Sequence, residues 1–330
     1  MAVLESLAPP GGSISSPPLL IIAYARIENV FRLIDQALEQ GVEQIYVAID
    51  GPKSSQILCR QEEMVSQLLR KSDSLKIPIN IWWRDRNLGV AVSVITALDW
   101  FFSKVNSGVI LEDDLIIEDT FYYYASHYLN YFSKEIQISI ISGNRFFPGA
   151  EPTSGPCLVH YPQTWGWATW RDRWEQIRVN AYKIEDQSKG AFFDPVRNFW
   201  HYGTLRVLQG RIDTWDVPVA NYMFKHKLYA LIPPFNLVSN LGNDEYATHT
   251  TSQSALMNAP LQAFTAIPEI KTSELISNCN QANRLLELRV FSIRRIHALL
   301  PLYYFLDSFR NRSLKLESLS VRLQSVTIPE

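Results

Sequence analysis

The chain has 330 residues, 47% hydrophobic and 19% charged, a composition typical of folded globular proteins rather than disordered ones. Its formal net charge of -2 argues against non-specific electrostatic binding to nucleic acid. Three cysteines without CxxC spacing exclude a disulfide framework and a zinc ribbon, and favour a reducing compartment. Residues 1–18 lack the charged and apolar regions of a signal peptide, and no run of 18 apolar residues occurs. We therefore expect a disordered lead-in at 1–18 and a cytoplasmic protein.

Residues 19–142 alternate short apolar runs with helical patterns. The patterns predict strands at 19–23, 45–49, 79–83, 109–111 and 138–142, separated by helices at 30–39, 54–70, 90–104 and 120–132. This order predicts an α/β fold with a largely parallel sheet flanked by helices on both faces. Ligands of such sheets bind at the carboxyl ends of the strands. The residues that directly follow each strand are therefore the candidates for a functional site.

The pattern is looser after residue 142. Residues 143–162 are rich in Gly and Pro and predict a long loop. Helices are expected at 196–209 and 214–226, a strand at 229–232, and a linker at 251–283. Residues 284–330 hold eight Lys and Arg against four Asp and Glu, and predict a basic amphipathic helical extension. Such a segment either lies on an anionic membrane surface or packs on the preceding domain with a solvated basic face.

The most informative motif is Glu112-Asp113-Asp114, directly after the strand at 109–111. Three adjacent carboxylates at a buried strand end repel one another, and a hard divalent cation would relieve that cost. Mg²⁺ or Mn²⁺ suits such oxygen ligands and keeps open positions for phosphate oxygens. The alternative is a solvated acidic turn before the next helix.

Two further strand ends carry polar residues. The loop Arg84-Asp85-Arg86-Asn87-Leu88-Gly89 leaves one strand and enters a helix. Arginines and backbone amides at a helix start bind phosphate, so Arg86 and Asn87 are nucleotide-binding candidates, although Asn and Gly are also ordinary turn residues. Asp50 either accepts hydrogen bonds from a nucleobase or ribose, or forms an Asp-Gly turn.

The first strand is followed by Tyr24-Ala25-Arg26, without the glycines of a dinucleotide-binding site or of a nucleotidyltransferase loop. Together these motifs resemble the GT-A glycosyltransferases, in particular N-acetylglucosaminyltransferase I and related bacterial sugar transferases. The matching segments, which span about residues 19–250, are 22–26, Asp50, the Glu-Asp-Asp motif at 112–114, Gly-Trp-Ala-Thr-Trp at 166–170 and Ala-Thr-His at 247–249. The resemblance implies a transferase domain at 19–250, with a nucleotide-binding half at 19–142 and an acceptor half at 143–250.

The resemblance also implies roles for individual residues. Asp114 would bind the metal, with His249 as a further ligand. The nucleotide-diphosphate sugar, with a UDP-sugar favoured, would contact Ala23, Arg26, Asp50, Arg86, Asn87, Glu112, Asp113, Gly166 and Trp167. The acceptor would be a saccharide or a lipid-linked molecule.

An aspartate that follows a tryptophan is the general base in the resembled family, which selects Asp216 after Trp215, with Asp213 second. The structural alternative is a capping box, in which Asp213 caps the helix at 214–226 and Asp216 occupies its third position, where the helix dipole favours a carboxylate. The tryptophans between 165 and 174 are expected mainly in the core, with one or two available to stack on a sugar. The alternative to an enzyme is a catalytically silent sugar- or nucleotide-binding module on the same fold.

Overall fold

A computed structural model describes residues 16–75, 77–146, 155–183, 193–241, 260–268, 270, 275, 279–303 and 318–329. The strands are β1 (Leu19–Ala23), β2 (Ile45–Ile49), β3 (Ile79–Trp83), β4 (Ser107–Glu112), β5 (Leu115–Ile117), β6 (Ile138–Ser142), β7 (Cys157–Val159), β8 (Trp167–Trp170), β9 (Tyr229–Ile232) and β10 (Val238–Asn240). The α-helices are α2 (Ile27–Glu39), α3 (Ser55–Leu75), α4 (Val90–Lys104), α5 (Phe121–Tyr131), α6 (Arg171–Asn180), α7 (Pro195–Leu208), α8 (Asp216–His226), α10 (Cys279–Leu285) and α12 (Leu319–Gln324). A π-helix η1 (Leu286–Val290) and a 3-10 helix η2 (Arg295–Leu299) follow α10.

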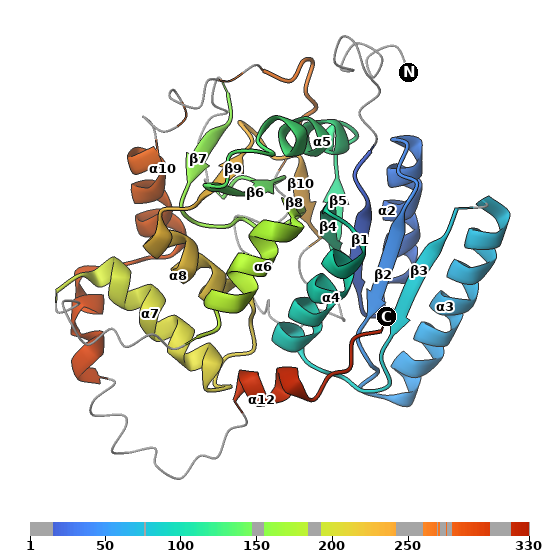
Figure 1. The fold of residues 1–330 in the computed structure, drawn as a ribbon, viewed down its shortest axis with the longest axis horizontal. Helices are drawn as coiled ribbons and strands as arrows, with labels where there is room; N and C mark the ends of the chain where they lie inside the picture. The colour runs from blue at the N-terminus through green and yellow to red at the C-terminus, as the bar shows by residue number, and fades with distance from the viewer. Residues whose placement is uncertain are drawn as a thin grey trace.

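The main sheet has eight strands in the order β3-β2-β1-β4-β8-β6-β9-β7 (Figure 1). Strands β3, β2, β1 and β4 are parallel to one another, β8 runs antiparallel between β4 and β6, β9 is parallel to β6, and β7 is antiparallel at the edge. Strands β5 and β10 form a separate antiparallel pair. The predicted α/β class with a largely parallel, helix-flanked sheet is confirmed.

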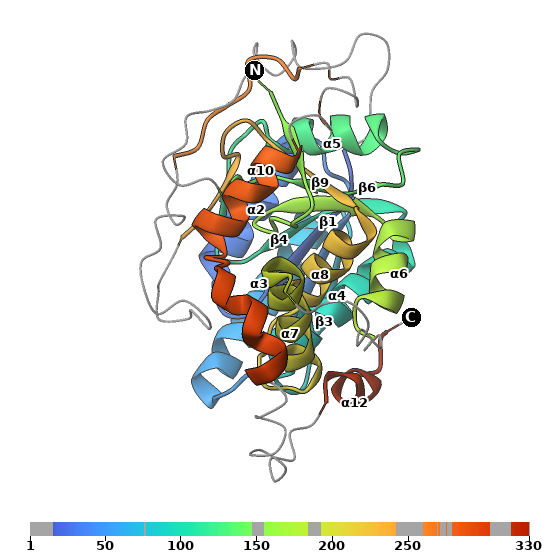
Figure 2. The same ribbon diagram turned by 90° about the vertical axis from the view of Figure 1, so that its left-hand side faces the viewer.

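Two apolar cores lie on the two faces of the sheet, because successive strand side chains alternate between faces. Leu19 and Ile21 of β1 pack with α2, α3 and α5. Leu20 and Ile22 pack with α4, α6, α7 and α8 on the other face. All five residues of β1 are buried, as expected for a strand covered on both sides. Figure 2 shows the same layers from the side.

The predicted strands before residue 143 all form, as does the strand at 229–232. Strands β5, β7, β8 and β10 were not predicted. They have three or four residues each, too few to show the alternation of apolar and polar residues that is typical of a strand. Strand β8 also has four buried residues in a row, three of which are Trp or Ala, so it shows no alternation.

The expected linker and tail differ from the structure. In the described part of 251–283, Phe264 and Ile270 are buried, and the hydroxyls of Tyr128 and Tyr131 on α5 donate to the carbonyls of Pro268 and Ile270. The described residues of 284–330 form several short helical segments rather than one amphipathic helix. Ser292, with φ of +51°, ends the first of them, since a positive φ cannot continue a right-handed helix.

Candidate functional site

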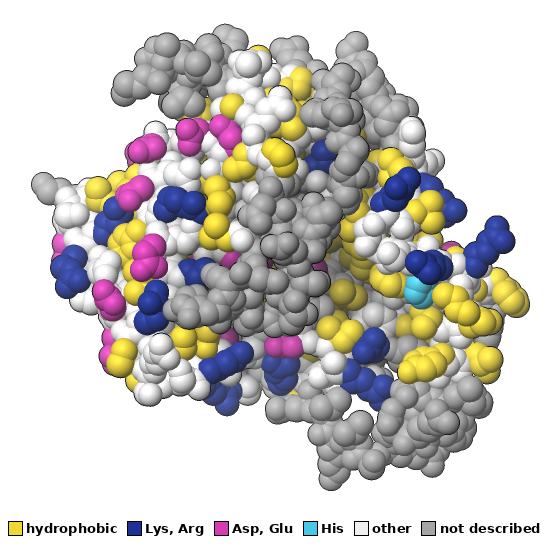
Figure 3. All heavy atoms as spheres, turned by 180° about the vertical axis from the view of Figure 1, so that it is seen from behind, with side chains coloured by type: hydrophobic (Ala, Val, Ile, Leu, Met, Phe, Trp, Pro, Cys, Tyr) yellow, Lys and Arg dark blue, Asp and Glu magenta, His cyan; other side chains and the backbone are white. Residues whose placement is uncertain are grey.

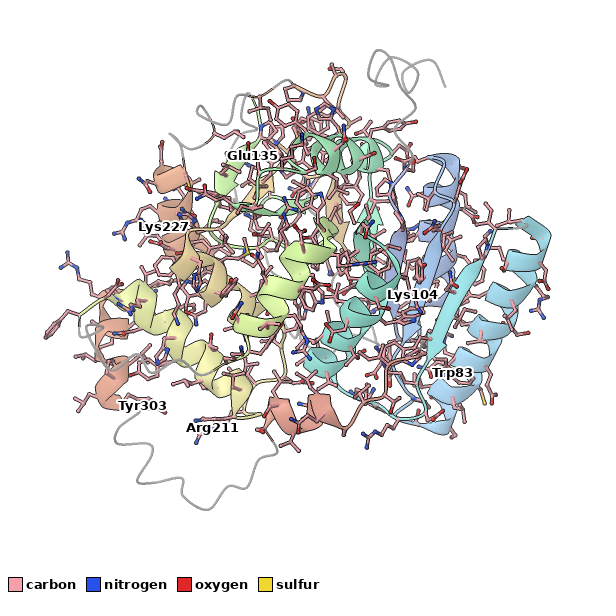
Figure 4. All side chains as sticks on the ribbon, viewed as in Figure 1. Trp83, Lys104, Glu135, Arg211, Lys227 and Tyr303 are labelled. Carbon is pink, nitrogen blue, oxygen red and sulfur yellow. The ribbon has the colours of Figure 1, made fainter. Side chains whose placement is uncertain are left out.

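The sheet topology places the candidate site between β1 and β4. From β1 the chain adds β2 and β3 on one side, then crosses to add β4 on the other side of β1. Open α/β sheets bind ligands at such a switch point, outside the carboxyl ends of the strands. In Figure 4 the labelled Trp83 marks the same edge of the sheet, at the end of β3. The loop after β1 and the acidic triplet after β4 therefore face each other across the switch point.

Asp113, the middle residue of the triplet, forms a buried ion pair with Arg26. The Arg26 guanidinium donates to its carboxylate at 2.7 Å, and the two side chains are 10% and 6% exposed. The backbone amides of Tyr24 and Arg26 donate to the other carboxylate oxygen at 2.6 and 3.4 Å. Asp113 thus fixes the loop after β1 to the end of β4. The amides of Tyr24 and Arg26 are used within the protein, whereas a glycine-rich phosphate loop presents its amides to phosphate.

Glu112 and Asp114, on either side of Asp113, are in a different environment. Burial and the neighbouring carboxylates of Asp114, Asp113 and Asp216 raise the pKa of Glu112 well above its usual range. Burial and the charge of Asp113 also raise the pKa of Asp114. One buried carboxylate oxygen of Asp114 has no hydrogen-bond partner among the described residues. Glu112 and Asp114 are therefore two neighbouring carboxyl groups whose ionisation is disfavoured unless a cation approaches them.

Asp216, the predicted base, belongs to the same region although it lies about a hundred residues further along the chain. It is the first residue of α8, and its charge contributes to the raised pKa of Glu112. Its carboxylate accepts a hydrogen bond from the Thr214 hydroxyl. The Trp215 ring before it is stacked on the Trp167 ring of β8, with centroids 5.5 Å apart. This stacking fixes the start of α8 to the centre of the sheet.

Trp167 and Gly166 have packing roles in this structure. Trp167 is 2% exposed, so its ring packs in the hydrophobic core. Gly166 has φ of +60°, and a Cβ built on it would lie 2.6 Å from a methyl carbon of Val238. The close approach at Gly166 is thus to β10. Contacts of Gly166 and Trp167 with a donor sugar stay predictions.

Asp50 organises the loop between β3 and α4. It is 7% exposed and accepts hydrogen bonds from the amides of Gly51 and Leu88 and from the side chain of Asn87. Burial raises the pKa of Asp50, and these bonds oppose the rise. The Asn87 amide also donates to the carbonyl of Gly51 at 2.9 Å. Asp50 and Asn87 are thus brought together as predicted, although their direct contact with a nucleotide stays a prediction.

Asp213, the second candidate base, caps a helix other than the one expected. Its carboxylate accepts from the amides of Val90 and Ala91, the first residues of α4, at 2.9 and 3.2 Å. The expectation that Asp213 caps the helix that follows it is wrong, since the residue before α8 is Trp215 and makes no side-chain cap, whereas Asp216 does lie in the first turn of α8. With its oxygens engaged by α4, Asp213 is a weaker candidate for the base than Asp216.

The contacts that the C-terminal segment makes at this edge of the sheet were not predicted from the sequence. Arg322 of α12 pairs with Asp213 at 3.3 Å and also donates to the carbonyl of Leu88. Arg86, predicted to bind the nucleotide, is exposed and donates to the side chain and carbonyl of Ser325. The segment 318–329 therefore holds the loop that Asp50 organises. The signal was absent because these contacts join residues that are between 109 and 239 positions apart.

Asn240, at the end of β10, was also missed. Its side chain forms a hydrogen bond with Asp114, which opposes the raised pKa of that carboxyl. The next residue, Leu241, donates its amide to the Asp114 carbonyl at 2.8 Å. The β5–β10 pair thus brings the chain back to the acidic triplet. The Ala-Thr-His motif, and His249 with it, lies outside the described residues.

The metal prediction is not confirmed by a ready-made ligand cluster. Among the residues that the structure describes, no group of three or more His, Cys, Asp or Glu side chains could hold a metal ion. Mg²⁺ that binds with substrate phosphates needs only one or two carboxylates. The Asp114 oxygen that has no partner in the described part of the chain, and the carboxyl groups gathered beside Glu112, fit that second kind of site.

No protein-family model matches the chain, and no curated protein matches it in sequence. Among solved structures it is similar to a putative glucose-1-phosphate thymidylyltransferase from Bacillus anthracis in complex with sucrose, at 9% identity and a TM-score of 0.36, over 68% of this chain and 89% of that one. It is also similar to a UDP-glucose pyrophosphorylase complexed with UDP-glucose, at 8% identity and a TM-score of 0.35, over 67% and 90% of the two chains. Similarities this distant do not identify an activity for this chain.

Proposed function

We propose that the chain is a metal-dependent, inverting glycosyltransferase that moves a sugar from a nucleotide-diphosphate sugar to a hydroxyl acceptor. One observation carries the proposal. The carboxylates of Glu112 at the end of β4, of Asp114 just after it, and of Asp216 at the start of α8 gather at the topological switch point of the sheet. The third member of the triplet, Asp113, is already paired with Arg26.

The residues present fit a divalent cation that is shared with a diphosphate. Asp114 supplies an oxygen that has no hydrogen-bond partner within the described segments, and Glu112 supplies a second carboxylate close by. Mg²⁺ or Mn²⁺ bound there would stabilise the charge that develops on the leaving nucleoside diphosphate. Arg26 does not compete for this role, because its guanidinium is paired with Asp113.

Asp216 is the general base in this proposal. Its carboxylate takes the proton of the acceptor hydroxyl while that oxygen forms the new bond to the anomeric carbon. The bond from the anomeric carbon to the diphosphate oxygen breaks, and the nucleoside diphosphate leaves with the electron pair. The Trp215–Trp167 stack and the Thr214 hydroxyl hold Asp216 in place, and such fixed alignment is a large part of the catalysis of group transfer.

Calorimetric titration of UDP with and without Mn²⁺ tests the metal site. We expect Mn²⁺ to strengthen UDP binding to the wild type and to have no effect on UDP binding to Asp114→Asn. Asp119→Asn is the matched control, because Asp119 is an exposed aspartate five residues further on and should bind as the wild type does. The same Mn²⁺ dependence in Asp114→Asn as in the wild type would contradict the assignment.

A second assay separates an enzyme from a silent binding module. UDP-sugars are incubated with the protein and Mn²⁺, and release of UDP is followed with time. The proposal expects slow hydrolysis that Asp216→Asn removes. Saturable binding of UDP-sugars with no release of UDP, in any combination with acceptor sugars, would favour the binding module.

A further inference from the structure

The segment 284–303 presents a surface that combines apolar and basic side chains. Six of the sixteen large apolar side chains that are exposed among the described residues lie in these twenty positions, namely Leu285, Leu288, Ile296, Leu299, Leu302 and Tyr303. Four exposed arginines, Arg284, Arg289, Arg294 and Arg295, are interspersed with them. We refer to these ten residues as the basic–apolar face.

The first half of the basic–apolar face is one side of a helix. Exposed residues recur at 281, 284, 285, 288 and 289 along α10 and η1, the spacing of a helical stripe. The opposite stripe, which includes Cys279, Ala282 and Leu286, is buried against the core. The buried side of this helix thus already covers the core, and the core does not require the side chains of Leu285 and Leu288. In Figure 2, α10 and the helical segment after it lie toward the viewer.

The charge of this surface is strongly one-sided. The single acidic residue of 284–303 is Glu287, which is 9% exposed and accepts a hydrogen bond from the Tyr161 hydroxyl at 2.7 Å. Arg284 forms an ion pair with Glu287 at 3.7 Å. In Figure 3, yellow and dark-blue side chains gather at the right-hand edge of the molecule with little magenta among them. A partner for this surface must therefore accept apolar side chains and carry negative charge.

We infer that the basic–apolar face binds the surface of an anionic lipid bilayer. Leucine and isoleucine side chains enter the boundary of headgroups and acyl chains, while arginines at the same level contact lipid phosphates. The described helices include none that is long and apolar enough to cross a membrane, so the contact would be peripheral. In Figure 4, Tyr303 lies on the opposite side of the molecule from Trp83. The inference concerns binding alone and does not rest on the proposed transfer reaction.

Flotation of the full chain with lipid vesicles tests the inference. Vesicles of neutral phosphatidylcholine are compared with vesicles that contain phosphatidylglycerol as well, at low and high salt. We expect binding to the anionic vesicles only, and weaker binding at high salt because exposed charges are screened. Each arginine near an anionic surface contributes about 1 kcal/mol, so Arg289→Gln/Arg294→Gln should weaken binding at least about tenfold.

Two matched controls make the test specific. Ile296 and Ile136 are both 64% exposed, but only Ile296 belongs to the basic–apolar face. Ile296→Gln should weaken binding, and Ile136→Gln should not. Arg70→Gln/Arg206→Gln changes two exposed arginines elsewhere and should bind as the wild type does.

Several results would overturn the inference. They are equal binding to neutral and anionic vesicles, no binding to either, or equal losses in the matched variants. Self-association that Ile296→Gln abolishes, without any vesicle binding, would instead assign the face to a second copy of the chain. UDP titration of the same variants keeps this test separate from the proposed function, since nucleotide binding should not change in any of them.

Discussion

The buried ion pair of Arg26 and Asp113 leads to a prediction that separates two roles of Arg26. Arg26 either stabilises the fold through this ion pair or binds the sugar donor. Arg26→Met removes the guanidinium and leaves the Asp113 carboxylate with only two backbone amides as partners. Both side chains are about nine-tenths buried. Loss of one partner of a buried ion pair costs about 3–5 kcal/mol. With an unfolding entropy of roughly 2.1 cal/mol/K per residue, the melting temperature of a 330-residue chain should fall by about 4–7 °C.

Calorimetry or thermal denaturation measures this loss of stability, and two control experiments show whether it arises from the buried ion pair. Lys71→Met removes a more exposed ion pair with Asp35, whose side chains are 21% and 55% exposed, and should cost about 1 kcal/mol or less. The double variant Arg26→Met/Asp113→Asn should lose less stability than the sum of its single variants, because no charge is left unpaired in the interior. A loss below about 1 kcal/mol in Arg26→Met, or strict additivity, would refute the structural role of the pair and return Arg26 to the list of donor-binding residues.

Three further predictions follow from the same edge of the sheet. Asp216→Asn should lower the rate of transfer by about 10²–10⁴-fold with UDP binding and melting temperature nearly unchanged; unchanged transfer would exclude Asp216 as the base. Arg322→Ala, which removes the hydrogen bonds of Arg322 to the Leu88 carbonyl and to the Asp213 carboxylate, should weaken UDP binding while the fold is retained, whereas Arg206→Ala should not weaken it. Glu112→Gln should raise the melting temperature in the presence of EDTA, and increasingly so from pH 5 to pH 8. The pKa of Glu112 is raised in the folded state, so its ionisation costs stability that is absent below the unfolded pKa near 4.5 and grows as the pH rises; an equal effect at every pH would contradict this.

Much of the fold could be predicted because its first half has strong local signals. Strands β1 and β2 are five-residue apolar runs, β3 is apolar except for Asn80, and the predicted bounds of all three are those of the structure. The parallel order then places Asp50 and the acidic triplet at one edge of the sheet by topology alone. The second half lacked such signals, since β7, β8 and β10 are short and pair with strands distant in sequence.

The partners of the site residues could not be predicted in the same way. Nothing local in the sequence says that Arg322 reaches the loop before α4, or that Asn240 reaches Asp114. Asp213 shows the limit most clearly. Its position before a helix predicted a cap on that helix, but its carboxylate caps α4 instead. The packing of α4 against the residues before α8 depends on the tertiary fold, and no local sequence pattern indicates it.

The three adjacent carboxylates show how one motif separates into different roles. A solvated acidic turn would leave all three exposed and their pKa values near the usual range, whereas Asp113 is buried and paired with Arg26. That pairing places a fixed negative charge between Glu112 and Asp114, and that charge contributes to the raised pKa of both neighbours. A chain under selection for stability alone would not keep Glu112 and Asp114 so close to other carboxylates, because the raised pKa of each means that its ionisation costs free energy of folding. The charge of Arg26 opposes both rises, and a bound divalent cation would oppose them further, which is the physical reason to look for the ion at Asp114.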